Sequence, residues 1–488
     1  MIRVQQVFFT YENMIDGAAI ADINVEIPKG QVVLLCGESG SGKTTFSRLI
    51  NGLIPTFYEG NVEGTASIRG KNIQEMELYE LAPYVGSVFQ NPKSQFYTLQ
   101  TDTEIVFACE NIGMKKSEIL AHFDNTVELF QLEKLLGKSL FALSGGEKQK
   151  IACASVNALM PDIFVLDEPT SNLDIETIQD MQKILISWKE QGKTVIIAEH
   201  RLTWLKAIAD RVIYFQKGKI AEDLTADQFW RKSSKQFQCM GLRASTEFNP
   251  PNRSKHIKEQ NIIIQGFQYR IKNIKLLEIS QLQIPKGSVV AVLGNNGAGK
   301  TTFARCLCGL LKKAEGTLSY NGKIYANKDR IHLCYMVMQD VNHQLFSESV
   351  LDEVLLGADV PSEENREAFA EGILSELDLL DYKDAHPMSL SGGQRQRVAI
   401  ASAVATHKEL LVFDEPTSGL DFRHMEEVAQ NVHKLSDMGK TQFIITHDPE
   451  LVSACCDYFL FMKEGEVISS GSWNEETRKY VSDYFKGL

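Results

Sequence analysis

The sequence predicts an α/β fold that occurs twice in tandem, each time as a mostly parallel sheet flanked by helices. Short apolar runs alternate with longer helix-like segments in both halves, as expected of strands that are connected by helices. The runs are apolar on both faces, which is typical of parallel strands covered by helices on both sides. Three motifs also recur in the same order, about 250 residues apart.

This recurrence predicts the domain organisation. A period of about 250 residues is too long for a solenoid repeat and indicates two whole domains, which fits the chain length of 488 residues. We expect the first domain at residues 1–243 and the second at residues 261–488. The segment between them, 244–260, is polar and contains Pro250 and Pro251, which is typical of a linker.

The composition is that of a globular protein, with 43% hydrophobic and 23% charged residues. No apolar run approaches the ~20 residues that cross a bilayer, and the N-terminus lacks the features of a secretory signal. If the protein works at a membrane, we therefore expect a separate subunit to span it. The net charge of −12 argues against a nucleic-acid partner. The nine cysteines show no zinc-site spacing and are expected to be reduced thiols.

The first motif of each half is a glycine-rich turn between a strand and a helix. Gln31–Cys36 is the first predicted strand, and the helix is expected to begin at Lys43. The turn matches G-x-x-x-x-G-K-[ST] in both halves, and its glycines let backbone N–H groups point at phosphate oxygens. In such a loop the lysine reaches the β- and γ-phosphates, and the next hydroxyl binds Mg²⁺. The predicted ATP-binding residues are Gly37, Ser39, Gly40, Gly42, Lys43, Thr44 and Thr45 in the first half and Gly294, Asn296, Gly297, Gly299, Lys300, Thr301 and Thr302 in the second, with Thr44 and Thr301 as Mg²⁺ ligands.

The second motif is an Asp-Glu pair at the end of an apolar strand. In the first half the predicted strand Ile163–Leu166 leads into Asp167 and Glu168, and the second half repeats the pair as Asp414 and Glu415. An aspartate at this place would hold Mg²⁺ through its water shell. The following glutamate could polarise the water that attacks the γ-phosphate. Taken alone, such a pair more often starts a solvated loop, but the upstream glycine turn favours the catalytic interpretation.

The third motif is a Ser-Gly-Gly sequence that opens a helix in each half. Serine is a good N-cap, and the glycines expose backbone N–H groups, so this helix start could bind an anion. On composition alone, an ordinary capped helix remains the alternative. The residues are Ser144, Gly145 and Gly146 in the first half and Ser391, Gly392 and Gly393 in the second.

The glycine-rich loop, the Leu-Ser-Gly-Gly-Gln/Glu sequence and the Asp-Glu pair after a strand together resemble the ATP-binding cassette (ABC) ATPases, over essentially the whole chain. The resemblance implies further site residues and a catalytic role for the glutamates. Two histidines, each 33 residues after its aspartate and at the end of the predicted strands 194–198 and 442–446, resemble the switch histidine that contacts the γ-phosphate. The implied residues are the Q-loop glutamines Gln90 and Gln339, which also approach Mg²⁺, the switch histidines His200 and His447, and the adenine-stacking aromatics Tyr11 and Tyr269.

In that family the two cassettes pair head to tail, so that ATP on one glycine-rich loop is closed over by the Ser-Gly-Gly of the other half. By resemblance, the first site is completed by Ser391 and Gly393, and the second by Ser144 and Gly146. Neither site lacks its lysine, glutamate or histidine, so both are expected to hydrolyse ATP. The difference between Glu147 and Gln394, one residue after the two glycines, is expected to be tolerated.

The segment after each Q-loop glutamine resembles that of energy-coupling factor (ECF) transporter ATPases. The first half reads Gln-Asn-Pro-Lys-Ser-Gln from Gln90, and a second glutamine also follows Gln339 by five residues. The first half departs from the ECF pattern after Phe96. The resemblance implies two partners, a transmembrane coupling subunit and a small membrane substrate-binding subunit. It places the chain peripherally at the cytoplasmic face of the cell membrane, where it energises uptake of a vitamin, vitamin precursor or metal ion.

Other ABC proteins remain as alternatives. Fused sugar-importer ATPases often lack the lysine of the second loop, and Lys300 is present here. Soluble translation factors of the ABC-F type carry a long, charged, helical linker, whereas the linker predicted here is short and contains proline. A non-ECF importer or a drug exporter would pair with a membrane partner that this sequence does not reveal. The transported substrate is not encoded in these motifs.

Overall fold

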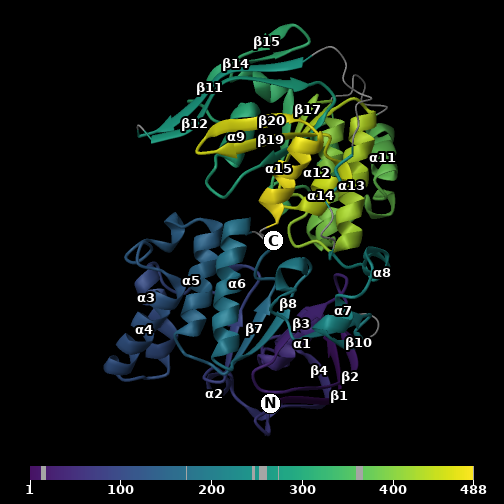
Figure 1. Ribbon diagram of the computed structural model, residues 1–488. Helices are drawn as coiled ribbons and strands as arrows, with labels where there is room; N and C mark the ends of the chain where they lie inside the picture. The colour runs from purple at the N-terminus through teal and green to yellow at the C-terminus, as the bar shows by residue number, and fades with distance from the viewer. Residues whose placement is uncertain are drawn as a thin grey trace. The chain divides into compact units, whose positions relative to one another are not determined.

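The computed structural model describes residues 1–12, 18–171, 173–244, 248–251, 261–272, 274–358 and 366–486. The chain divides into two compact units, which Figure 1 shows in ribbon form. The bulk of the first is Met1–Thr246, and the bulk of the second is Glu247–Leu420 with His424–Lys486. The proposed linker 244–260 lies largely outside the described residues, so the domain boundaries stay predictions.

The predicted mostly parallel sheet is present in each unit, which confirms the fold class. In the first unit the strand order is β10-β9-β3-β8-β7-β6, with β9 and β10 antiparallel and the other pairs parallel. In the second unit the order is β16-β17-β18-β13-β19-β20, with an antiparallel β19–β20 pair. The strands are β3 (Val32–Cys36), β6 (Val85–Val88), β7 (Ile163–Asp167), β8 (Thr194–Ala198), β9 (Arg211–Gln216) and β10 (Lys219–Thr225), then β13 (Val289–Leu293), β16 (Cys334–Val337), β17 (Leu410–Asp414), β18 (Thr441–Ile445), β19 (Tyr458–Lys463) and β20 (Glu466–Ser472).

Each unit also contains a four-stranded antiparallel sheet, which the sequence analysis did not predict. Its order is β2-β1-β4-β5 in the first unit and β12-β11-β14-β15 in the second. Buried and exposed residues alternate along much of these strands, as in sheets with one face on a core and one in solvent. The strands are β1 (Ile2–Tyr11), β2 (Ile20–Ile27), β4 (Gly60–Ile68) and β5 (Lys71–Asn72), then β11 (Asn261–Ile271), β12 (Ile274–Pro285), β14 (Glu315–Tyr320) and β15 (Lys323–Tyr325).

Strand β3 shows how the first unit buries both faces of its parallel sheet. Its alternate residues Val32, Leu34 and Cys36 join a core with the helices of one face. Val33 and Leu35 join a second core with helix α1 (Lys43–Ile50) and the antiparallel sheet. Helix α1 therefore packs between the two sheets, which fixes the glycine-rich turn that precedes it.

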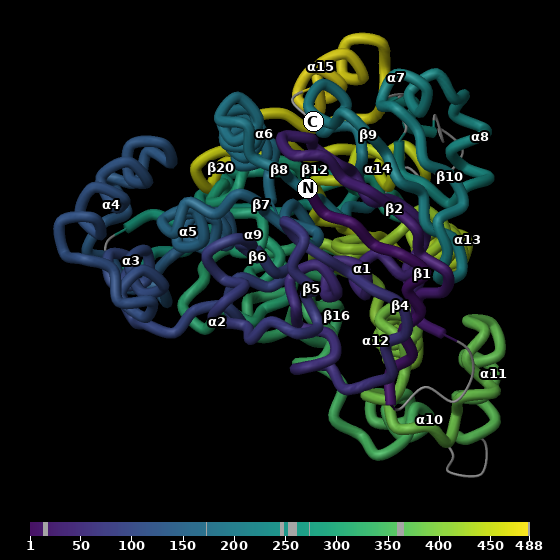
Figure 2. The backbone as a smooth tube through the Cα atoms, turned by 90° about the horizontal axis from the view of Figure 1, so that it is seen from below, coloured from purple at the N-terminus to yellow at the C-terminus, as the bar shows by residue number. Residues whose placement is uncertain are grey.

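The remaining helices cover the sheets and form a helical group in each unit. Helices α3, α4 and α5 pack against one another in the first unit, and α10, α11 and α12 do so in the second (Figure 2). The helices are α2 (Leu78–Leu81), α3 (Thr101–Asn111), α4 (Lys116–Phe130), α5 (Gly145–Asn157), α6 (Ile175–Glu190), α7 (Ala226–Phe229) and α8 (Ser234–Cys239), then α9 (Lys300–Leu307), α10 (Val350–Leu356), α11 (Arg366–Glu376), α12 (Gly392–Ala405), α13 (Phe422–Asp437), α14 (Pro449–Cys455) and α15 (Glu475–Phe485).

The predicted elements agree with the structure to within a residue. The first strand begins at Val32 instead of Gln31, and the strand predicted at 442–446 is β18, Thr441–Ile445. The helix predicted to begin at Lys43 does so. Within the described ranges, no helix is both long and apolar enough to cross a membrane. All nine cysteines are free thiols, and eight of them are buried, with Cys239 the exposed one.

Candidate functional site

The glycine-rich loop of the first unit connects β3 to α1. Gly37, Gly40 and Gly42 have positive φ angles of 149°, 73° and 107°. A Cβ atom on Gly37 would lie 2.4 Å from the carbonyl oxygen of Phe215, so no larger residue fits there. Gly42 caps α1 without a side-chain hydrogen bond, which leaves the first N–H groups of the helix to an anion.

Lys43 is buried inside this loop. Its Nζ donates hydrogen bonds to the carbonyl oxygens of Gly37 and Glu38, both at 2.8 Å. Burial lowers the pKa of Lys43, and the charge of Glu168 opposes that shift. The ammonium group is thus held against carbonyl dipoles at the place where the motif predicts the β- and γ-phosphates.

The proposed Mg²⁺ ligands lie together in both units. The Thr44 hydroxyl donates to Asp167 at 3.2 Å, and the Thr301 hydroxyl donates to Asp414 at 3.2 Å. Hydroxyl and carboxylate oxygens are the hard donors that Mg²⁺ takes alongside phosphate oxygens and water, so these residues fit the ion. Burial, with a smaller contribution from the neighbouring Glu168, raises the pKa of Asp167 to about 6. Burial also raises the pKa of Asp414.

In the first unit two other predicted site side chains, Gln90 and His200, lie against Glu168. Gln90 Nε2 donates to one carboxylate oxygen of Glu168 at 2.7 Å, and His200 Nε2 lies 3.3 Å from the other. Glu168 itself has a φ of 45°, and Glu415 in the second unit has a φ of 49°. A left-handed backbone at a non-glycine residue directly after a strand is strained, and such strain is concentrated at functional sites.

A pocket of about 420 Å³ lies over the glycine-rich loop. Tyr11 is at its side, where the Tyr11 hydroxyl is 3.1 Å from the hydroxyl of Thr45. Nine residues named from the sequence line it, and the structure therefore brings together Tyr11, Ser39, Gly40, Gly42, Lys43, Thr44, Thr45, Glu168 and His200.

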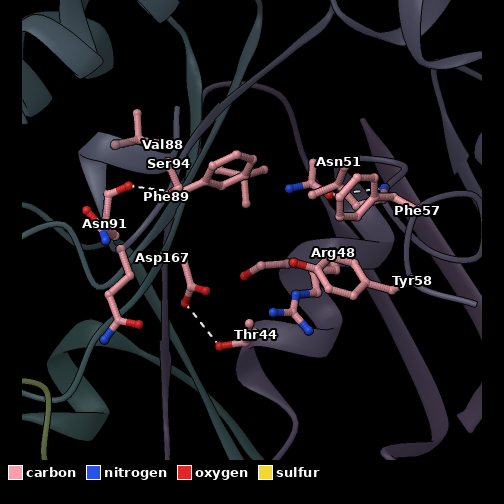
Figure 3. A pocket seen from close by; sticks show the side chains of 14 residues that line it. Thr44, Arg48, Asn51, Phe57, Tyr58, Val88, Phe89, Asn91, Ser94 and Asp167 are labelled. Atoms are coloured by element: carbon pink, nitrogen blue, oxygen red, sulfur yellow. Dashed lines mark hydrogen bonds between the residues drawn. The ribbon is translucent and has the colours of Figure 1, made fainter. Parts of the chain in front are cut away.

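A second pocket of about 360 Å³ is also lined by Thr44 (Figure 3). Thr44, Asp167 and Gln90 line it together with residues that the sequence analysis missed. The Arg48 guanidinium stacks 3.8 Å from the ring centre of Tyr58 and donates to the Tyr11 hydroxyl at 3.0 Å. Tyr58 lies in the stretch between the first and second motifs that is longer in the first half, and that extra length is the signal that could have found it.

The second unit repeats the loop with a different set of contacts. Lys300 Nζ donates to the carbonyl oxygens of Gly294 at 2.5 Å and Asn295 at 3.0 Å. It also lies 3.0 Å from Nε2 of His447. Because an ammonium group can only donate, Nε2 of His447 accepts in this state. The backbone N–H of His447 donates to Glu415 at 3.3 Å, and its Nε2 is 3.6 Å from the same carboxylate.

The remaining predicted residues of the second unit take equivalent positions in the chain. Gly297 and Gly299 have positive φ angles of 78° and 99°, like their counterparts in the first unit. Gln339 follows β16, and Tyr269 lies on β11, where it is partly buried against the core. Asn296 lies in the loop and Thr302 in α9, next to Thr301. The ligand contacts of all these residues stay predictions.

The Ser-Gly-Gly segments cap helices as expected. Ser144 is the N-cap of α5 and Ser391 is the N-cap of α12, and each closes a capping box with the residue three positions later. Glu147 accepts the backbone N–H of Ser144 at 2.8 Å, and Gln394 accepts that of Ser391 at 2.9 Å. Glutamate and glutamine therefore accept the same capping hydrogen bond at this position.

Three buried carboxylates near the sites were also missed by the sequence analysis. Glu199 precedes the switch histidine of the first unit and is 2% exposed. Glu104 on α3 and Glu353 on α10 are likewise buried and bind the loop that follows each Q-loop glutamine. The sequences of the two halves around the histidines and the Q-loops carry the signal, because acidic residues recur there in both halves.

Comparisons with known proteins agree with this geometry. A family model described as ABC transporter matches residues 20–171 and 277–418. A Treponema denticola protein that carries the name ABC transporter ATP-binding protein is 44% identical over 477 residues, with 96% of each chain covered. A Methanosarcina mazei protein of the same name is 32% identical over 525 residues, covering 96% of this chain and 89% of that protein.

Solved structures show the same fold. A chain from the model of ribosome-bound archaeal Pelota and ABCE1 superposes with a TM-score of 0.69 at 20% identity. The superposition covers 98% of this chain and 80% of that one. At this identity, the likeness shows that two such units in one chain are a known architecture, and it shows the fold alone.

Proposed function

This chain belongs to the ABC transporter family, and from that premise we propose that it is the ATP-hydrolysing subunit of an importer of the ECF type. The chain is an ATPase with two cassettes. The proposal adds a transmembrane coupling subunit and a small membrane substrate-binding subunit, with this chain bound peripherally at the cytoplasmic face. The cargo would be a vitamin, a vitamin precursor or a metal ion, as the sequence after Gln90 suggests by resemblance.

The proposed chemistry is phosphoryl transfer from ATP to water. Bound Mg²⁺ would neutralise charge on the phosphate oxygens. The lysine of each loop would bind the β- and γ-phosphates, the glutamate would polarise the attacking water, and the histidine would contact the γ-phosphate. We further propose that the two cassettes pair head to tail, so that each Ser-Gly-Gly closes the opposite site. The residues in these roles are Lys43, Thr44, Asp167, Glu168 and His200 in the first unit and Lys300, Thr301, Asp414, Glu415 and His447 in the second.

One observation supports a partner at the Q-loops. Each unit exposes an aromatic ring two residues after the second glutamine of its Q-loop segment, and we call Tyr97 and Phe346 the Q-loop aromatics. Tyr97 is 77% exposed and Phe346 is 75% exposed. Aromatic residues are enriched in protein–protein interfaces, where a few residues carry most of the binding energy. Their repetition at the same place in both units favours a partner that contacts both Q-loops.

The loops that carry the Q-loop aromatics are held by buried carboxylates. Glu104 accepts the backbone N–H groups of Tyr97 at 3.2 Å and Thr98 at 2.8 Å. Glu353 accepts those of Phe346 and Ser347, both at 2.9 Å. Burying a carboxylate is costly unless it is hydrogen-bonded. In both units a hydrogen-bonded buried carboxylate thus fixes a loop with a largely exposed ring, and the Tyr97 ring also stacks on Phe107 at 5.2 Å. This arrangement supports a docking role for the rings.

The test is to purify the tagged full-length chain from membranes of its native host after mild detergent extraction and to identify what accompanies it. Recovery of a coupling-type membrane protein with a small membrane protein is the expected result. Recovery of ribosomes without a membrane partner would contradict the proposal and favour a translation factor.

A pair of variants locates the docking surface. Replacing both Q-loop aromatics by serine should abolish co-purification of the membrane proteins and leave ATP binding intact. Neither residue belongs to the motifs predicted to bind ATP, and Tyr97 does not line the pocket over the first glycine-rich loop. Tyr79→Ser is the matched control, because Tyr79 is 72% exposed in the first unit but lies on α2. Equal loss of partner in the control would show that the Q-loop aromatics are not the docking surface.

A further inference from the structure

The two units differ on either side of the switch histidine. The first unit reads Glu199-His200-Arg201, whereas the second reads Thr446-His447-Asp448. Both arrangements place a buried acid next to the threonine that follows Asp-Glu-Pro, namely Thr170 and Thr417. The acid precedes the histidine in the first unit and follows it in the second. The equivalent threonines therefore donate to acids at different positions in the sequence.

In the first unit Glu199 collects three donors. The hydroxyl of Thr170 donates to one carboxylate oxygen at 2.8 Å. The backbone N–H groups of His200 and Arg201 approach the other oxygen at 3.0 and 3.4 Å. Arg201, at the position of the second unit's acid, donates from its guanidinium to the carbonyl oxygen of Thr170 at 2.7 Å. In the first unit Glu199 and Arg201 therefore both bind Thr170, one at its hydroxyl and the other at its carbonyl oxygen.

In the second unit the equivalent hydrogen bonds have different acceptors. Asp448 accepts the hydroxyl of Thr417 at 2.6 Å, and Thr446 accepts the backbone N–H of Asp448 at 3.0 Å. The backbone N–H of His447 donates to the carboxylate of Glu415 at 3.3 Å. The N–H that Glu199 accepts in the first unit is thus directed at the proposed general base in the second.

This difference has a consequence for the general base. A carboxylate that accepts a backbone N–H is oriented by that bond and becomes a weaker acceptor for water. In the first unit the two oxygens of Glu168 instead face side-chain groups, Gln90 at 2.7 Å and the His200 ring at 3.3 Å. We propose that Glu199 is a positioning residue of the first ATP site: by accepting the backbone N–H groups of His200 and Arg201, it leaves Glu168 to Gln90 and the His200 ring.

The test replaces the two residues beside the first unit's histidine by those of the second unit. The full-length chain with Glu199→Thr and Arg201→Asp keeps an acceptor for Thr170, because an aspartate at 201 occupies the place that Asp448 has beside Thr417. A backbone N–H of His200 is then able to turn to Glu168. Steady-state Mg²⁺-dependent ATP hydrolysis is compared with the wild type and with Glu168→Gln, which marks the rate without the first site's base.

The expected result is a kcat that lies nearer to the Glu168→Gln value than to the wild-type value but stays above it, because the second unit has these same residues and is also expected to hydrolyse ATP. The Kd for ATP should be unchanged within about threefold, because the glycine-rich loop is untouched. A purely structural role of Glu199 would change the melting temperature and the Kd together. Three results would overturn the proposal. They are a kcat nearer the wild-type value, a change confined to the Kd, and a Glu168→Gln reference that is as fast as the wild type.

A second variant decides the matter if the exchange does not fold. Glu199→Met has nearly the same length and volume but no carboxylate oxygen, so neither Thr170 nor the two backbone N–H groups keeps its acceptor. The expected result is again a kcat nearer to the Glu168→Gln value than to the wild-type value, with the Kd unchanged. A wild-type kcat in this variant would overturn the positioning role.

Discussion

At the scale of single residues, the buried carboxylate Asp167 destabilises the nucleotide-free protein when it is charged. Burial raises the pKa of Asp167 to about 6 from an ordinary value of 3.8. A carboxyl whose pKa is raised by folding stabilises the folded state below the unfolded pKa, and this contribution is lost as the pH rises through the folded pKa. Between about pH 4 and 6, the nucleotide-free protein should therefore lose part of its stability to this one group.

Replacing Asp167 by asparagine tests this cost. At pH 7.5 without nucleotide, Asp167→Asn should melt above the wild type, by about 2–4 °C for each kcal/mol relieved. The difference should shrink as the pH falls to 5.5. Total ATP hydrolysis should fall to about half of the wild-type rate, because the first site loses its proposed Mg²⁺ ligand while the second site keeps its own. Thermal melts and ATPase assays provide the measurement, with Asp124→Asn on exposed α4 as the control. A lower melting temperature at pH 7.5 would contradict the stated burial cost.

Sequence reasoning at this scale identified residue types but not their partners. Gln90 and Glu168 are hydrogen-bonded although they are 78 residues apart, and the family pattern gives each a role without giving the bond. Arg48, Tyr58 and Glu199 escaped notice because they belong to no shared motif. Their importance depends on which neighbours the fold supplies, and that information is three-dimensional.

At the scale of elements, the capped helices α5 and α12 make the difference between Glu147 and Gln394 testable. Both side chains accept the N–H of the capping serine, so Glu147→Gln should change the free energy of unfolding by only a few tenths of a kcal/mol. Ser144→Ala removes the cap itself and should cost about 1 kcal/mol. Denaturant unfolding of both variants provides the measurement. A cost for Glu147→Gln equal to that of Ser144→Ala would show that the charge, and not the capping geometry, matters at this position.

The elements themselves were predictable where one pattern decides the structure. The four central strands whose bounds the sequence predicted, β3, β7, β8 and β18, are largely apolar, and their ends lie within a residue of the prediction. The antiparallel sheets were missed because β1 and β4 pair across a long stretch of chain, and alternation along each strand does not name its partner. The helices α3, α4 and α5 likewise gain their packing from one another.

At the scale of the whole molecule, two complete loops predict two bound nucleotides per chain. Isothermal titration with a non-hydrolysable ATP analogue and Mg²⁺ should give a stoichiometry of about two. Lys43→Ala or Lys300→Ala should lower it to about one, because each lysine serves the loop of its own unit. Lys219→Ala, an exposed lysine on β10, is the control. A value of one for the wild type would contradict the expectation that both loops bind nucleotide.

Because each unit contains buried cysteines, local unfolding can be measured in each unit separately. Cys36, Cys109 and Cys153 lie inside the first unit, and the other five buried thiols lie inside the second. A buried thiol reacts with an alkylating reagent only when the protein around it opens, so the rate of modification measures a local unfolding equilibrium. Mass spectrometry of the modified chain would give the alkylation rate of each cysteine. These rates would distinguish local unfolding of one cassette from that of the other. Exposed Cys239 would supply the unprotected rate within the same molecule.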